Sequence, residues 1–77
     1  MIVKIKTDHI RLDQLLKFAA IVDSGGLAKH LIRDGFVYLN GTTCTQRGKK
    51  IFSGDLVEVI IAKEGIHERV EVVLEEK

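Results

Sequence analysis

Apolar residues at helical spacing dominate the first third of the chain. The stripe recurs at i, i+3, i+4 and i+7 and consists of Leu12, Leu15, Leu16 and Ala19. This spacing places the four side chains on one face and predicts an amphipathic helix. Thr7 and Asp8 favour the start of a helix. We expect this helix to stop near Val22 or Asp23, because the glycine pair at 25–26 follows.

The same helical spacing returns a few residues later. Its members are Ala28, Leu31, Ile32 and Gly35. Ser24 precedes this stripe and is expected to cap the helix by accepting a hydrogen bond from a backbone N–H two or three residues on. Gly35 is placed to end the helix in a left-handed conformation. Lys29, His30 and Arg33 are displaced from the stripe, so we expect them to meet solvent.

The period changes from helical to extended on either side of these helices. Alternating or β-branched apolar residues predict strands at residues 2–6, 37–39, 42–45, 56–61 and 70–74. Asn40-Gly41 and Ser53–Asp55 predict turns, and Gly65 predicts a break. Residues 46–50 are expected to form a polar, basic loop. The order of one strand, two helices and four strands predicts a small α+β fold.

Size and composition indicate a single domain over residues 1–77. A chain of 77 residues buries only about 60% of the surface that its unfolded form exposes, so the core is thin. The N-terminal residues alternate apolar with charged types and lack the apolar core of a signal sequence. The single Cys44 cannot form an internal disulfide and fits a reducing compartment. We therefore expect a bacterial, cytoplasmic protein without a membrane partner.

The net charge of +1 conceals an asymmetry. Residues 1–50 carry nine Lys and Arg against four acidic residues, a net charge of +5. Residues 51–77 carry three against seven, a net charge of −4. One half can attract a polyanion while the other keeps the protein soluble. Two ordinary solvated surfaces are the alternative, and composition alone leaves both interpretations open.

Two segments carry groups that bind phosphate. In the loop Arg47–Lys50, arginine can hold a phosphate through two parallel N–H bonds, and lysine acts as a point charge. At Ser24–Gly26, free N–H groups and the positive end of a helix dipole favour an anion. The alternatives are a solvated loop and a tight turn between helices. The nucleotide-binding signature G-x-x-x-x-G-K-S/T is absent from the sequence.

A stripe of cations is also predicted on the helices. Lys29 and Arg33 are four residues apart and therefore share one helical face. With Lys17 or Arg11 on the first helix, they are placed to continue toward the basic loop. Adjacent like charges are mildly destabilising on a helix, so their presence favours an anionic partner.

The sequence predicts no catalytic, metal or cofactor site. The three histidines are scattered without a second ligand at metal spacing, and neither the serines nor Cys44 have a base nearby in sequence. We therefore expect a protein that is not an enzyme and takes no small-molecule substrate. Aromatic residues are few, which disfavours a base-stacking sheet. Phe18 and Phe36 are expected in the core, and Tyr38 is expected to be exposed.

Several of these features combine into a family pattern. Its residues are Arg11-Leu12-Asp13, Leu15-Leu16, Ser24, Ala28-Lys29, Leu31-Ile32, Gly35, Val37, Leu39-Asn40-Gly41, Gly54-Asp55, Val57 and Val59. The pattern covers about Ile10 to Ile60 and resembles the S4 RNA-binding domain, in particular its small stand-alone bacterial members. The resemblance implies an α+β fold with two packed helices against a small, mostly antiparallel curved sheet, the alpha-L motif.

The resemblance also implies an RNA-facing surface on the helix pair and the adjoining hairpin. By position, Arg11, Ser24, Lys29 and the Asn40 turn lie on or beside it. Many S4 domains have arginine after the serine, whereas Gly25 stands here. This departure removes a phosphate contact, and we hypothesise that the 47–50 loop compensates. S4 domains often accompany a catalytic domain, and none is present in this sequence.

The leading hypothesis is a non-catalytic protein that binds structured RNA, either ribosomal or transfer RNA, in ribosome assembly or RNA handling. A ribosome or ribosomal precursor is a further expected partner. The candidate RNA-binding residues are Arg11, Lys17, Ser24, Gly25, Gly26, Lys29, Arg33, Asn40, Arg47, Lys49 and Lys50. One alternative is a protein-interaction adaptor whose acidic half docks a basic partner. Another is a ubiquitin-like sulfur carrier, although the chain ends Glu75-Glu76-Lys77 rather than Gly-Gly.

Overall fold

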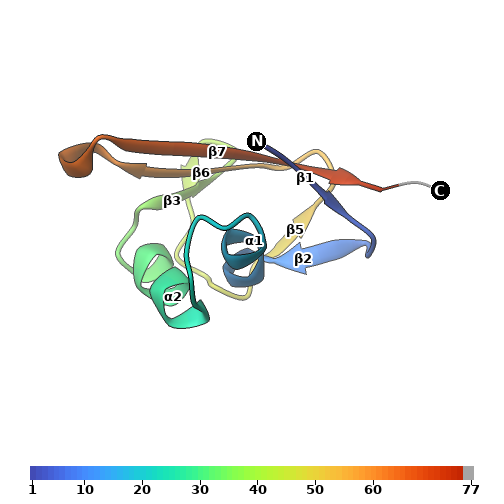
Figure 1. Cartoon of the computed structure of the whole chain (residues 1–77), viewed down its shortest axis with the longest axis horizontal. Helices are drawn as coiled ribbons and strands as arrows, with labels where there is room; N and C mark the ends of the chain where they lie inside the picture. The colour runs from blue at the N-terminus through green and yellow to red at the C-terminus, as the bar shows by residue number, and fades with distance from the viewer. Residues whose placement is uncertain (76–77) are drawn as a thin grey trace.

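A five-stranded sheet and two helices form two layers. The computed structural model describes residues 1–75. Its elements are β1 (Ile2–Ile5), β2 (His9–Arg11), α1 (Leu12–Phe18), α2 (Gly25–Arg33), β3 (Val37–Leu39), β4 (Thr42–Thr43), β5 (Lys50–Phe52), β6 (Leu56–Ile61), a 3-10 turn η1 (Ala62–Glu64) and β7 (Ile66–Leu74). Figure 1 shows the sheet above and both helices beneath it.

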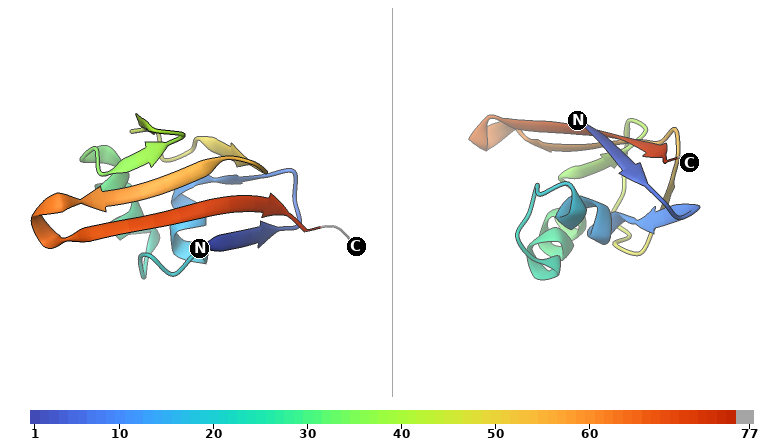
Figure 2. Two further views of the ribbon diagram at one scale, coloured as in Figure 1. Left: turned by 90° about the horizontal axis from the view of Figure 1, so that it is seen from above. Right: turned by 45° about the vertical axis from the view of Figure 1, so that its right-hand side comes forward.

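The main sheet is mixed but mostly antiparallel. Its strand order is β1-β7-β6-β3-β4, and β1 pairs with β7 in the parallel direction while the other pairs are antiparallel. The β6–β7 hairpin runs along the 41 Å axis of the molecule, as Figure 1 and the left view of Figure 2 show. β2 and β5 form a separate antiparallel two-stranded ribbon beside α1. The predicted α+β class and two-helix arrangement are confirmed.

The core lies between the sheet and the helices. α1 buries Leu12, Leu15 and Leu16 completely, and Ile32 of α2 is also fully buried. On β6, every second residue faces this core, beginning with Val57. Each such side chain stabilises the fold by about 1.5–3 kcal/mol. Within residues 1–75, no polar or charged residue is buried, so the cations and carboxylates all reach solvent.

The first helix differs from its prediction at both ends. Its start near Thr7 and Asp8 is wrong, because β2 intervenes and the Thr7 hydroxyl donates to the His9 carbonyl at 2.7 Å. The predicted stop near residues 22–23 is also wrong, since the helix ends at Phe18. Ala20 takes a positive φ of 59°, and the N–H of Ile21 donates to the Leu16 carbonyl at 3.0 Å. This early turn lets Val22 pack into the core, with 4% of its surface exposed.

The second helix has both predicted ends. The N–H of Leu27 donates to the Ser24 hydroxyl at 3.2 Å, which confirms Ser24 as the cap. Gly35 follows the helix with a φ of 84°. The N–H of Phe36 donates to the Leu31 carbonyl at 3.1 Å, the long bond that closes a helix on a left-handed glycine. The predicted helix termination is therefore confirmed.

The strand predictions are confirmed in part. Strands at residues 37–39 and 56–61 are as predicted, and both Asn40 and Gly41 have positive φ in their turn. The predicted strand at 42–45 ends at Thr43. β7 begins at Ile66 rather than Val70, because it pairs with β6 as far as Ile61. The ribbon strands β2 and β5 were not predicted, and Lys50 belongs to β5 rather than to a loop.

Two aromatic expectations need correction. Phe18 is 64% exposed, so its expected place in the core is wrong. It is the last residue of α1 and lies outside the buried stripe of that helix. Tyr38 is half-buried rather than exposed as expected. Phe36 is half-buried and packs against the core. Phe52 on the ribbon is 45% exposed.

Candidate nucleic-acid interface

The basic loop is fixed to the start of α1 by backbone hydrogen bonds. The N–H of Leu12 donates to the Lys49 carbonyl at 2.9 Å, and the N–H of Asp13 donates to the Arg47 carbonyl at 3.0 Å. The first N–H groups of a helix have no partner within the helix, so the loop satisfies two of them. Arg11 occupies the N-cap position without a side-chain cap bond in the described chain. The loop cations are therefore held at one end of α1.

The β2–β5 ribbon brings a fourth cation to the loop. Arg11 lies directly opposite Lys50 in the antiparallel register. Opposed residues project from the same face with Cβ atoms about 4.5–5.5 Å apart, and like charges there are destabilising. Asp13 offsets part of this repulsion, because Arg11 donates to it at 3.0 Å. We call the exposed side chains of Arg11, Arg47, Lys49 and Lys50 the basic cluster.

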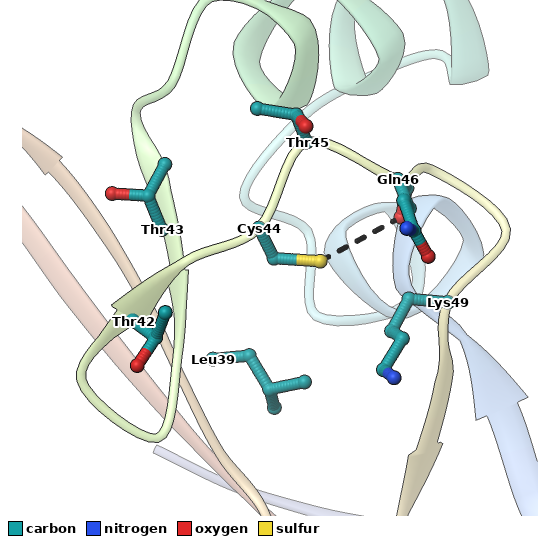
Figure 3. A pocket seen from close by; sticks show the side chains of 7 residues that line it. All are labelled: Leu39, Thr42, Thr43, Cys44, Thr45, Gln46 and Lys49. Carbon is teal, nitrogen blue, oxygen red and sulfur yellow. Dashed lines mark hydrogen bonds between the residues drawn. The ribbon is translucent and has the colours of Figure 1, made fainter.

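A hollow of about 290 Å³ lies beside the basic cluster. Its lining residues are Leu39, Thr42, Thr43, Cys44, Thr45, Gln46 and Lys49. Figure 3 shows the hollow, including the 3.9 Å contact between the Cys44 thiol and the Gln46 carbonyl. Three hydroxyls, an amide and an ammonium thus border one surface depression. Cys44 is half-buried, and it follows β4 instead of lying in the strand predicted at residues 42–45.

The first residues of α2 have free space around them. Ser24 uses its hydroxyl to cap the helix, and Gly25 and Gly26 are its first two residues. A Cβ on Gly25 would meet no described atom within 4 Å, and one on Gly26 would make only an ordinary contact with Ser24. Packing therefore does not require glycine at either position. An anion site at Ser24–Gly26 stays a prediction.

The cations of the two helices, Lys17, Lys29 and Arg33, are exposed. The hydrogen bonds and ion pairs described for them do not connect them to the basic cluster. Lys17 lies in the last turn of α1, at the end away from the loop. Lys29 and Arg33 lie on α2, which packs against α1. Arg33 donates to His30 Nδ1 at 2.8 Å and lies 3.9 Å from Asp34. A cationic stripe from α2 to the loop stays a prediction.

Asn40 has a structural role in joining two turns. Its Oδ1 accepts from the N–H of Leu56 at 2.9 Å, and its Nδ2 donates to Asp55 at 3.1 Å. The other carboxylate oxygen of Asp55 accepts from the N–H of Phe52 at 2.8 Å. These bonds explain why an Asn-Gly turn and a Gly-Asp turn occur together in this sequence. An RNA contact by Asn40 stays a prediction, and its amide is already engaged within the protein.

The residues that the sequence reasoning missed lie on the ribbon. His9 and Phe52 face each other in the register and share the exposed face with Arg11 and Lys50. His9-Ile10-Arg11 alternates polar with apolar residues, as a strand with one buried face does, but Lys50-Ile51-Phe52 does not alternate. The sequence pattern therefore marks one of the two ribbon strands and gives no sign of their pairing.

Residues 1–75 show neither a metal site nor a transmembrane helix. The described side chains include no group of three or more His, Cys, Asp or Glu placed to hold a metal ion. Within the same residues, no helix is long and apolar enough to cross a membrane.

The fold and the positions of the motif residues define a member of the S4 domain family. The family model described as S4 domain matches residues 3–67, and the chain belongs to this family. It is similar to the probable ribosome maturation protein RlbA of Bacillus subtilis (strain 168), with 39% identity over 57 residues. The match covers 74% of this chain and 80% of that protein.

A solved structure supports the same fold. The chain is similar to heat shock protein 15 of Vibrio cholerae, solved as a trimer, with a TM-score of 0.68 and 21% identity. The match covers 79% of this chain and 59% of that one, which is less than two thirds of the solved chain. At this level of identity the likeness concerns the fold alone.

Proposed function

We propose that this chain is a non-catalytic RNA-binding protein that holds structured RNA, either ribosomal or transfer RNA, in the cytoplasm. Membership of the S4 domain family and the similarity to a protein named for ribosome maturation support a role in ribosome assembly. The observation that carries the proposal is the basic cluster. Two backbone hydrogen bonds and a strand pairing fix its four cations around the start of α1.

The physical reason is the match between fixed cations and phosphates. Arginine can hold a phosphate with two parallel bonds, and the two lysines at 49 and 50 add point charges. Because the backbone is already tied to α1, binding orders side chains rather than a whole loop. A phosphate-dominated interface loses affinity steeply as salt rises. Double-stranded segments would be recognised by shape and 2′-hydroxyls.

The test removes the loop cations and measures binding against salt. The probe is purified bacterial ribosomal RNA, titrated by filter binding between 50 and roughly 300 mM salt. In the variant, Arg47, Lys49 and Lys50 are all changed to Ala. We expect weaker binding. The slope of log K against log salt concentration should become less negative by about two to three, since each lost phosphate contact removes about one from it.

A matched control removes three cations elsewhere. Lys4, Lys6 and Lys63 are exposed and lie on β1, just after it and in the η1 turn. Their joint change to Ala lowers the net charge equally but should leave the salt slope within about one of the wild type. Equal losses in both triple variants would contradict a localised phosphate site. Unchanged binding in the loop variant would do the same.

The adaptor alternative rests on the acidic β6–β7 hairpin. Glu58, Glu68 and Glu71 lie on these two strands, which extend along the long axis of the molecule. A basic protein docked there would remain bound after RNase treatment of a cell extract, whereas RNA-mediated partners would be released. Membership of the S4 family argues against the sulfur-carrier alternative.

A further inference from the structure

The exposed face of the β2–β5 ribbon carries an aromatic pair next to two cations. His9 lies opposite Phe52, and the ring centroids are 5.7 Å apart with planes inclined by 47°. Two residues along, Arg11 lies opposite Lys50 on the same face. Ile51 on the other face is fully buried and anchors the ribbon to the core. The ribbon therefore presents a fixed aromatic surface beside positive charge.

A surface hollow adjoins this aromatic pair. It has a volume of about 400 Å³, and its lining residues are Thr7, His9, Ile10, Arg11 and Gln14. The His9 side chain is 36% exposed, and Phe52 beside it is 45% exposed. The volume falls within the range of small-molecule and nucleotide pockets. The His9 imidazole, a hydroxyl, an amide and the Arg11 guanidinium thus border one depression, and the Phe52 ring lies next to His9 outside that lining.

This combination suits an unpaired nucleobase better than a duplex or an apolar peptide. Bases stack on aromatic side chains irrespective of their sequence, because every base has a π face. The cations lie about 6.6 Å along the ribbon from the rings, two strand residues away, where phosphates flanking a stacked base can reach them. An apolar peptide would give Lys50 no counter-charge and would leave Arg11 with Asp13 alone.

We propose that His9 and Phe52 stack on an unpaired nucleobase of the bound RNA while Arg11 and Lys50 contact the phosphates beside it. This inference rests on the proposed function and adds to it. It assigns to the domain a preference for RNA that has a loop, bulge or single-stranded end next to a helix. In this proposal the basic cluster attracts the phosphates, and the aromatic pair on the ribbon favours RNA with unpaired bases.

The first test compares two RNA probes of equal phosphate number. One is a hairpin with an eight-uridine loop, and the other is a blunt duplex. Phe52→Ala should weaken hairpin binding by about 5- to 150-fold, the worth of one base–aromatic stack, and leave duplex binding within about twofold. Phe18→Ala is the matched control, because Phe18 is also exposed and lies at the opposite end of α1. It should leave both affinities unchanged.

The second test reports stacking directly. The chain contains no tryptophan, so a single introduced indole gives an unambiguous fluorescence signal. The emission of the Phe52→Trp variant should be quenched by the hairpin but not by the duplex. The Phe18→Trp emission should respond to neither probe. Circular dichroism melts confirm that each variant is folded before titration.

The outcomes separate this inference from the proposed function. If the wild type does not bind the hairpin, the stacking inference is overturned, while the proposed function is decided separately by the ribosomal RNA titration. If the wild type binds both probes but Phe52→Ala changes neither affinity, stacking is overturned while RNA binding stands. An equal loss on hairpin and duplex also overturns stacking, because the ring then only supports the basic cluster.

Discussion

The Asn40–Asp55 link makes a quantitative prediction about stability. Asn40→Ala removes a neutral hydrogen bond to Leu56 and one to the Asp55 carboxylate. The first is worth about 0.5–1.5 kcal/mol and the second about 1.5–3 kcal/mol. Alanine at the φ of 50° seen at this position costs a further 1–2 kcal/mol, roughly. Since Asn40 is exposed, water recovers part of the loss, and we expect about 2–4 kcal/mol in total.

The assay is thermal unfolding followed by circular dichroism. A chain of this length has a free energy of unfolding of about 4–12 kcal/mol, so the variant loses a large share of it. Its Tm should fall by about 10–25 °C. Asn40→Gly is the matched control, because glycine accepts the positive φ and loses only the hydrogen bonds. It should be more stable than Asn40→Ala by about 1 kcal/mol. A Tm within about 3 °C of the wild type for Asn40→Ala would refute the structural role.

Three further predictions concern stability and affinity. Ser24→Ala should lower the free energy of unfolding by about 0.5–2 kcal/mol in urea titrations, because α2 loses its N-cap; no change would mean that the 3.2 Å bond contributes nothing. Ile51→Ala should cost about 2–5 kcal/mol in the same assay, since it leaves a cavity under the ribbon. Gly25→Arg should bind ribosomal RNA more tightly, with a salt slope steeper by about one, while its Tm stays at or above that of the wild type. An unchanged affinity and an unchanged salt slope would place the RNA away from the start of α2.

The parts of the fold with strong local signals could be predicted from the sequence. The stripe on α2, its serine cap and the glycine after it are local features, and each was confirmed. The ribbon could not be predicted in this way, because β2 and β5 are three residues each and lie about forty residues apart. The end of α1 depends on Ala20 adopting a positive φ, which alanine rarely does.

The site was predictable in composition but not in arrangement. The cations of the 47–50 loop are evident in the sequence, yet their link to α1 depends on two carbonyl groups that any residue could supply. The types of side chain in the loop therefore do not predict these backbone hydrogen bonds. For Phe18 the side-chain type was misleading, because this apolar residue at the end of α1 is exposed to solvent. Surface aromatic residues are normal singly, and only the pairing of Phe52 with His9 marks the ribbon.

We propose that bound RNA lies against the start of α1 and the β2–β5 ribbon. Ultraviolet crosslinking in cells, followed by mass spectrometry of the crosslinked peptides, locates the contact on the protein itself. We expect crosslinks in residues 9–13 and 46–52, with Phe52 among them. Crosslinks confined to the β6–β7 hairpin, or none above the level of an RNase-treated control, would contradict it.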